Sequence, residues 1–499
     1  VVMLSASINV RWKPSKMFEL TSFTMGSYND YGKSHDLEVL TSAYNLKAYQ
    51  NAMQKKKLIG ETLAANLRVG SGGLFFANTS FIANSAKGDI DILSDSLLIQ
   101  TKHILNGCFY EYGTYRYVPS YSLNNELGYS HRFNKKRVLR LTVAYGKERE
   151  DVESHGITKE PLQDKYTSLR YCISARFSKQ TGFLRYNIGN RVVWSQSKYA
   201  SHNSKTKAEW CPDIMLHFVF SQKQELRLAG QRSVSTAPYE HFLTYGMPLD
   251  YNSYRAVSLM ESPFVTKEQL FLHYRIIEQY YNFLLFVNAN YSQEKGSGMD
   301  KVLQDGILST HTYVDGGNTK NMTLSTTIRK GLGNMPVDVQ LYAGYNFSSL
   351  PFAIGETISD YRMKRFTNSL TFSSRYLSAI NAEIRGLFEK TEINTSSYKT
   401  ESNEYSVSGK LMFAKNKWKG EFIYSYEVID GDLAYHSNHN LGFRLSYNLQ
   451  HLYFRLSGTN ILHIREYEWS ETNTSTNHQS QTQYIRLPGY FLATMGWRF

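Results

Sequence analysis

The final segment of the chain, Gly489 to Phe499, alternates between two kinds of side chain at every second residue. One set is apolar and largely aromatic, and it comprises Phe491, Ala493, Met495, Trp497 and Phe499. The other set comprises Leu492, Thr494, Gly496 and Arg498. Because successive side chains of a β-strand point to opposite faces, the pattern predicts a strand with one face suited to hydrocarbon and the other to water.

The same two-residue period recurs along the chain, most clearly in residues 139–146, 169–177, 337–347 and 441–449. A helix would place its apolar residues three and four positions apart, so these segments predict strands. A tilted strand crosses a membrane with about 9–11 residues, of which only every second one must be apolar. The mean hydropathy of −0.43 is therefore compatible with a membrane protein that crosses the bilayer with strands.

The 499-residue chain carries a formal net charge of +13 and 14% aromatic residues. In a soluble protein this charge would indicate nucleic-acid binding. In a barrel it fits a polar lumen, or a rim that meets anionic head groups. We therefore expect outer-membrane lipid and lipopolysaccharide as partners and no nucleic acid.

Short turns alternate with long polar loops between the predicted strands. The turns fall near residues 13–16, 69–73, 134–137, 179–181, 222–224, 279–281, 333–336, 378–380, 416–417 and 450–451. Short periplasmic turns and long extracellular loops are typical of outer-membrane barrels. The pattern predicts an all-β, transmembrane antiparallel β-barrel, with about 21 strands present of 22, since bacterial single-chain barrels have an even number.

Residues 1–499 are thus expected to form one outer-membrane barrel domain that lacks its first strand and a plug domain. The start of the sequence has no signal-peptide pattern, which suggests a processed or truncated N-terminus. Within the loops, Asp36–Lys57 is predicted to hold a short surface helix. Residues 86–119 are predicted to form an extracellular hairpin or a flap.

The C-terminal sequence RLPGYFLATMGWRF resembles the closing strand of TonB-dependent receptor-type outer-membrane barrels of the Bacteroidetes kind. Residues 226–242, 268–292 and 311–332 are similar to mid-barrel passages of that family. In this resemblance Phe491, Trp497 and Phe499 belong to the barrel-closing strand. The loop 239–266 departs from the family by lacking its Asn-Pro-Asn-Leu-Lys-Pro run.

The resemblance implies a non-enzymatic protein of the Gram-negative outer membrane that takes up a nutrient, with TonB as a partner through a plug. A surface lipoprotein is a further partner that such barrels bind. The alternative is a barrel without transport that serves as a scaffold or accessory subunit of an outer-membrane complex. A passive pore and a barrel enzyme are weaker alternatives, and no cofactor is implied.

Strand parity places a set of arginines on the face opposite the apolar residues. These lumen-facing candidates are Arg140, Arg170, Arg176, Arg227, Arg275, Arg329, Arg444 and Arg455. They would attract anionic solutes or hold an acidic plug face. The alternative is ordinary ion pairing inside the barrel, with Glu383, Glu421 and Glu427 as partners.

Other chemistry-bearing residues form no convincing site. His436, His439, His451 and His463 lack the converging ligands that a metal needs, so we predict no metal site. Val69–Gly73 is rich in glycine, but no helix follows it, so we interpret it as a turn. Three widely spaced cysteines form no disulfide framework, and no catalytic arrangement is apparent.

Overall fold

The computed structural model describes most of the chain. It covers residues 2 to 497 except 41–44, 95–109, 135, 156–161, 200–201, 243–246, 249–252, 306–307, 334, 375–378, 396–398, 432–433, 450–451, 463–466, 476–477 and 487–488. Of the predicted features, Cys108, His451, His463 and Phe499 lie outside the described residues.

The described residues are almost entirely β-structure. The first strands are β1 (Val2–Trp12), β2 (Phe18–Leu40), β3 (Asn45–Val69), β4 (Gly73–Ser94), β5 (Tyr110–Asn134), β6 (Arg137–His155), β7 (Leu162–Lys179), β8 (Leu184–Tyr199), β9 (His202–Val219) and β10 (Gln224–Thr236). A 3-10 helix, η1 (Tyr239–Phe242), and the short strands β11 (Met247–Pro248) and β12 (Ser253–Arg255) follow.

The second half continues in the same manner. Its strands are β13 (Phe264–Glu278), β14 (Phe283–Lys295), β15 (Met299–Asp305), β16 (Leu308–Val314), β17 (Asn318–Gly331), β18 (Val337–Ile354), β19 (Thr357–Ser374), β20 (Ile380–Asn394), β21 (Lys399–Lys415), β22 (Trp418–Gly431), β23 (Ala434–Asn448), β24 (Leu452–Thr459), β25 (Tyr467–Ser475), β26 (His478–Arg486) and β27 (Tyr490–Trp497). The described residues contain no helix long and apolar enough to cross a membrane.

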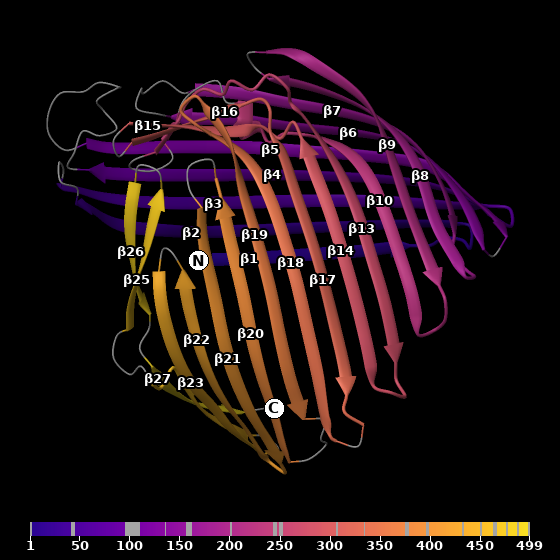
Figure 1. Ribbon diagram of the computed structural model, residues 1–499. Helices are drawn as coiled ribbons and strands as arrows, with labels where there is room; N and C mark the ends of the chain where they lie inside the picture. Colours follow the sequence, from indigo (N-terminus) through magenta and orange to yellow (C-terminus); the bar gives the residue numbers. More distant parts are fainter. Residues whose placement is uncertain are drawn as a thin grey trace.

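One antiparallel path of strands forms the wall of the molecule. It runs through β1 to β10, then β13 and β14, then β17 to β24, and ends at β27, which makes twenty-one strands. In Figure 1 the early strands pass behind the late ones, so that the sheet curves around an enclosed space. The predicted all-β antiparallel architecture is confirmed.

The two ends of the wall are β1 and β27. β1 pairs with β2 and β27 pairs with β24, and the described residues record no pairing between β1 and β27. Because neighbouring wall strands are antiparallel and their number is odd, β1 and β27 run in the same direction. The additional first strand and the plug domain stay predictions.

Tight turns connect the wall strands at one end, as the sequence predicts. The hairpins β1–β2, β3–β4, β5–β6, β7–β8, β9–β10, β13–β14, β17–β18, β19–β20, β21–β22 and β23–β24 turn at the predicted positions. Asn282 and Asn416 adopt φ values of 45° and 56° in two of these turns. Asn tolerates this left-handed region better than most residues, which explains its use there.

The predicted surface helix at Asp36–Lys57 is wrong. β2 extends to Leu40 and β3 begins at Asn45, so both arms belong to one long antiparallel hairpin in which Asp36 lies opposite Tyr49. The Ala-, Lys- and Gln-rich sequence has good helix propensity, but pairing across the hairpin overrides this weak local preference. For residues 86–119 the hairpin alternative is confirmed in the described residues, because the end of β4 pairs with the start of β5 from Ser85 opposite Pro119 to Ser94 opposite Tyr110.

Additional strands lie at the end opposite the tight turns. β15 and β16 form a hairpin between β14 and β17, and β12 pairs with β16 in parallel orientation. β25 and β26 form a separate two-stranded hairpin between β24 and β27. The long connections therefore carry structure of their own at this end of the wall (Figure 1).

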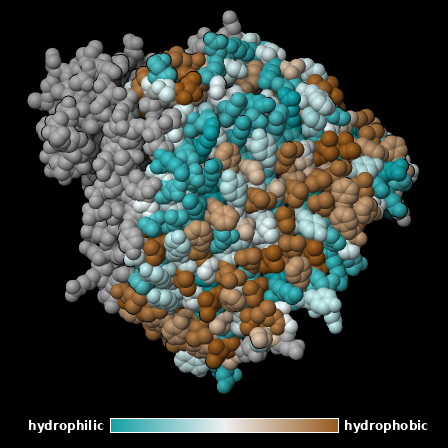
Figure 2. Space-filling model, in the orientation of Figure 1, coloured by the Kyte–Doolittle hydropathy of each residue, from teal (hydrophilic) through white to brown (hydrophobic). Residues whose placement is uncertain are grey.

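The outer face of the wall is apolar. Alternate residues of successive strands expose large apolar side chains, among them Leu127, Val143, Ile173, Trp210, Leu270, Leu341, Val407, Phe422 and Phe454. Figure 2 shows hydrophobic residues gathered across the middle and lower part of the visible outer face, with hydrophilic residues above them. A surface of this kind is suited to hydrocarbon rather than to water.

Candidate functional site

Strand β8 shows how the two faces of the wall differ. Its outward residues Ile188, Val192 and Trp194 are exposed, whereas the inward residues Ser195 and Ser197 are 2% and 0% exposed. The inward side chains of β8 are therefore covered by other parts of the protein, whereas its outward side chains are not. The alternation of the strand determines which face each side chain points to, but burial of the inward side chains requires a further element on the inner face.

The covering element is the connection between β10 and β13, here called the inner unit and defined as residues 237–263. Within its described parts, the Phe242 ring stacks on Tyr199 of β8 with a centroid distance of 4.1 Å. Tyr199 also contacts Tyr166 of β7 at 5.1 Å. Met260 is 2% exposed and belongs to the same apolar cluster. The inner unit therefore packs on the lumen side of β7 and β8.

Hydrogen bonds to β16 and its following residue fix the inner unit in place. The Leu259 amide donates to the Tyr313 carbonyl at 2.8 Å, and the His241 ring stacks on the Tyr313 ring at 4.0 Å. The amides of Glu261 and Ser262 donate to the Asp315 carboxylate at 2.8 and 3.1 Å. The inner unit is thus held from two sides, by the wall and by the β15–β16 hairpin.

Three predicted arginines form separate ion pairs on the inner face. Arg140 pairs with Glu126 at 2.8 Å, and its guanidinium lies 4.1 Å from the centroid of the Phe76 ring. Arg176 pairs with Asp213 of β9 at 2.5 Å. Arg329 pairs with Asp338, whose side chain is 3% exposed.

Arg227 and Arg275 meet at one carboxylate, Glu225 on β10. The distances are 2.9 Å to Arg227 and 3.2 Å to Arg275, and His217 of β9 lies 3.0 Å from the same carboxylate. Three neighbouring strands therefore converge on Glu225, which is 7% exposed. A carboxylate so enclosed holds its charge because several hydrogen-bond donors surround it.

Arg444 and Arg455 meet in a hollow on the inner side of the C-terminal strands. The hollow has a volume of about 390 Å³, and Glu421, Ile423 and Leu492 also line it. Arg444 lies 3.9 Å from Glu421, and Lys410 lies 3.0 Å from the same side chain. Glu421 is therefore the one carboxylate among those expected from the sequence that pairs with a candidate arginine in the described residues. Arg170 belongs neither to the cluster around Glu225 nor to the hollow at Arg444 and Arg455. It lines a separate, smaller polar cavity.

Charged partners on other strands are the residues that the sequence pattern alone missed. Glu126, Asp213, Glu225 and Asp338 all lie at alternate positions on the polar face. The alternation of the sequence predicts that these residues point to the inner face, but which arginine each one pairs with depends on the register between strands. Arg176 and Asp213 come together through the register of three strands, because Arg176 lies opposite Gly189 of β8 and Gly189 lies opposite Asp213.

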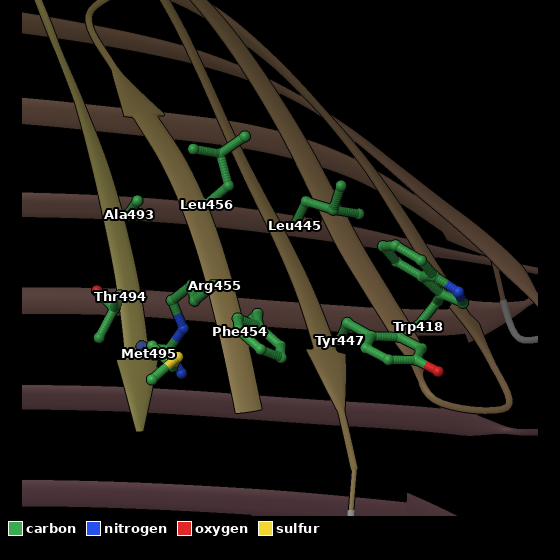
Figure 3. Close-up of a pocket in the computed structure, with 9 residues that line it drawn as sticks. All are labelled: Trp418, Leu445, Tyr447, Phe454, Arg455, Leu456, Ala493, Thr494 and Met495. Carbon is green, nitrogen blue, oxygen red and sulfur yellow. The ribbon is translucent and has the colours of Figure 1, made fainter. Parts of the chain in front are cut away.

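A second hollow lies on the C-terminal part of the wall, and its volume is about 440 Å³. Trp418 and Tyr447 border it with ring centroids 4.7 Å apart, and Phe454, Leu456 and Met495 complete most of its lining (Figure 3). The small side chain of Ala493 on β27 leaves space between its larger neighbours. Phe491 and Trp497 of the same strand are 59% and 63% exposed.

The remaining candidates for chemistry are structural. Cys172 and Cys211 are free thiols, and Cys211 is packed against Val193, Val234 and Phe264. His439 stacks on Tyr426 at 4.4 Å in an exposed position. Within the described residues no group of three or more potential metal ligands comes together.

Comparison with known proteins gives matches among solved structures alone. No family model and no curated protein matches the chain. The siderophore receptor PirA from Pseudomonas aeruginosa aligns with 100% of this chain and 76% of its own, at 8% identity and a TM-score of 0.38. The copper transporter OprC aligns with 99% of this chain and 79% of its own, at 9% identity and a TM-score of 0.44.

The ferric citrate transporter FecA aligns with 99% of this chain and 75% of its own, at 10% identity and a TM-score of 0.47. These three solved structures are thus those of a siderophore receptor, a copper transporter and a ferric citrate transporter. Every one of these TM-scores is below 0.5. The case for a membrane barrel therefore rests on the strands and side chains of this chain.

Proposed function

We propose that the chain is the barrel wall of an outer-membrane receptor of the TonB-dependent type, which takes up a nutrient ligand. The observation that carries this proposal is the difference between the two faces of one continuous sheet. The outer face exposes Ile173, Trp210 and Leu341, whereas the inner face carries ion pairs and a folded inner unit. Such a wall separates hydrocarbon from an aqueous lumen.

The inner unit supports uptake of a selected ligand over free diffusion. It occupies the lumen side of β7 and β8 and is tied down by Asp315 and Tyr313. An element in this position narrows the path through the barrel and leaves a shaped surface for a solute. Energy coupling through a plug and TonB, with the ligand captured by the long loops, completes the proposed mechanism.

A second candidate function is that of a scaffold in an outer-membrane complex with a surface lipoprotein. One observation favours it, namely the apolar hollow bordered by Trp418 and Tyr447. This hollow lies where β27 pairs with β24, so a partner protein would find apolar surface there.

The test compares a strain carrying the full-length gene with its deletion strain and a strain without inner-membrane energy coupling. Growth in a defined mixture of peptides and oligosaccharides above the porin size limit is followed by mass spectrometry of the medium. Transport predicts at least one solute that only the parent strain depletes. Equal depletion in all three strains, with the protein present in the outer membrane, would support the scaffold instead.

A further inference from the structure

A polar cavity on the inner face of the wall has the features of a ligand site. Its volume is about 130 Å³, and it lies between the N-terminal wall and the end of β10. Its lining comprises Asn124, Glu148, Ser168, Arg170, Ser195 and Thr236, together with Gly146 and Ser235. Ser168 and Ser195 are 6% and 2% exposed, so two hydroxyl groups are held in the cavity wall.

The cavity contains one positive and one negative side chain at defined positions. Arg170 of β7 lies opposite Gly146 of β6, and Ser168 lies opposite Glu148, so the two charged residues occupy diagonal positions on neighbouring strands. Diagonal neighbours in an antiparallel pair are about 7–8 Å apart. Neither charged group forms an ion pair with another residue in the part of the chain that the structure describes.

Gly146 keeps the space between these charges open. The residue is buried, and a Cβ atom at this position would lie 2.8 Å from Oδ1 of Asn124 and 3.9 Å from Nε of Arg170. Any larger residue would therefore push Asn124 and occupy the floor of the cavity. Strand geometry alone does not require glycine here, because its φ is not in the left-handed region.

We infer that this cavity binds the α-amino acid group of a solute in its zwitterionic form, an inference that rests on the proposed uptake function and names its ligand class. The guanidinium of Arg170 would donate two parallel hydrogen bonds to the carboxylate. The Glu148 carboxylate would accept hydrogen bonds from the ammonium group, while Asn124 and the serine hydroxyls contact the remaining polar atoms. The side chain of the solute projects into the lumen, where both charged residues are exposed.

A zwitterion fits better than a simple anion or cation. A lone carboxylate bound to Arg170 would face the like charge of Glu148, and a lone amine would face the like charge of Arg170. Only a ligand with both charges satisfies both residues. The cavity volume suits a small group of this kind and excludes a whole sugar or a larger ion complex.

The test measures binding of alanine to the purified full chain in detergent by ligand-observed NMR, with acetate and methylamine as half-ligands. Arg170→Gln and Glu148→Gln should each weaken alanine binding about tenfold or more, since each removes a charge-assisted contact. Arg149→Gln is the matched control, because Arg149 lies on the other face of β6 and pairs with Asp151. It should leave alanine binding unchanged.

Two outcomes would overturn the inference. The first is alanine binding that neither variant alters, or no alanine binding at all, in protein that retains its folded migration on a gel. The second is acetate binding as strong as alanine binding and unaffected by Glu148→Gln, which would make the cavity a plain anion site. Because binding is measured in detergent, either result is distinguishable from a failure of uptake in cells.

Discussion

Strands β8 and β22 belong to the same wall but differ on their inner faces. On β8, Trp194 is 39% exposed on the outside, while the adjacent inward Ser195 is 2% exposed. On β22, Phe422 is 47% exposed on the outside and the adjacent inward Ile423 is still 40% exposed. The inner unit covers β8, and no described element covers β22 in the same way.

The difference shows what the sequence pattern of such a wall encodes. Under the inner unit, the inward side chains are small or aromatic and pack closely, as Ser197 and Tyr199 do. On the open part, they are long and charged, as Glu421 and Arg444 are. Alternation between apolar and polar residues marks most of the wall, with inward exceptions such as Val193 and Ile423, whereas side-chain size on the inner face marks where the lumen is filled.

Removing the anchor of the inner unit is expected to have the largest effect. Met260→Ala would leave a cavity in the cluster formed with Tyr166, Tyr199 and Phe242. Truncation of a buried Met costs about 2–5 kcal/mol. We expect the inner unit to detach and to become sensitive to added protease, while the wall keeps its folded migration on a gel.

Met17→Ala serves as the control for this prediction, because Met17 is 56% exposed in the β1–β2 turn. It should leave the protease pattern as in the parent. If the Met260→Ala variant and the parent resist protease equally, this cluster does not hold the inner unit in place. The contrast between a covered β8 and an open β22 would then not depend on this packing.

The next prediction concerns β22, where the exposed fractions of the outward Phe422 and the inward Ile423 are similar and do not show which residue faces the membrane. Phe422→Arg places a charge on the outer face, which costs about 2–4 kcal/mol near the middle of the bilayer and less toward the interface. Ile423→Arg places the same charge toward the lumen, where water solvates it. Urea unfolding of the protein in lipid vesicles should show a clear loss for the first variant and little change for the second. The reverse order would invert the assignment of the two faces.

A smaller effect is expected at the ion pairs of β10. Glu225→Gln keeps the shape of the side chain but removes the charge that Arg227, Arg275 and His217 share. Loss of such a partner costs about 1–3 kcal/mol, with the lower value expected here because both arginines are partly exposed. The midpoint of urea unfolding should fall, and Glu421→Gln on the open wall should lower it less.

Local patterns predicted the wall well and its interior poorly. Period-two alternation needs only the sequence of one strand, and tight turns are marked by Asn and Gly, so strand order and parity were readable. The convergence of His217, Glu225 and Arg275 requires the register of three strands at once. The packing of Phe242 on Tyr199 joins a residue of the β10–β13 connection to a residue of the wall strand β8, and no local signal indicates it.

The smallest expected effect lies in the tight turns, outside the membrane-spanning part. Hydrogen bonds from Lys223, 2.7 Å away, lower the pKa of Glu278 below its ordinary value. A carboxyl with a lowered folded-state pKa adds stability above its unfolded pKa, and this stability is lost as the pH falls through the folded value. Lys223→Gln should remove this contribution, so its melting temperature should lie slightly below that of the parent at neutral pH.

The two melting curves should converge as the medium is acidified below the folded-state pKa of Glu278, because both proteins then carry a neutral carboxyl group at this position. Both groups are exposed, and salt screens such pairs, so the difference should also shrink at high ionic strength. A difference that persists unchanged at acidic pH would assign the stabilisation to packing of the Lys223 side chain instead of its charge. The turn would then resemble the covered wall of β8, where packing dominates, more than the open wall of β22, where charge does.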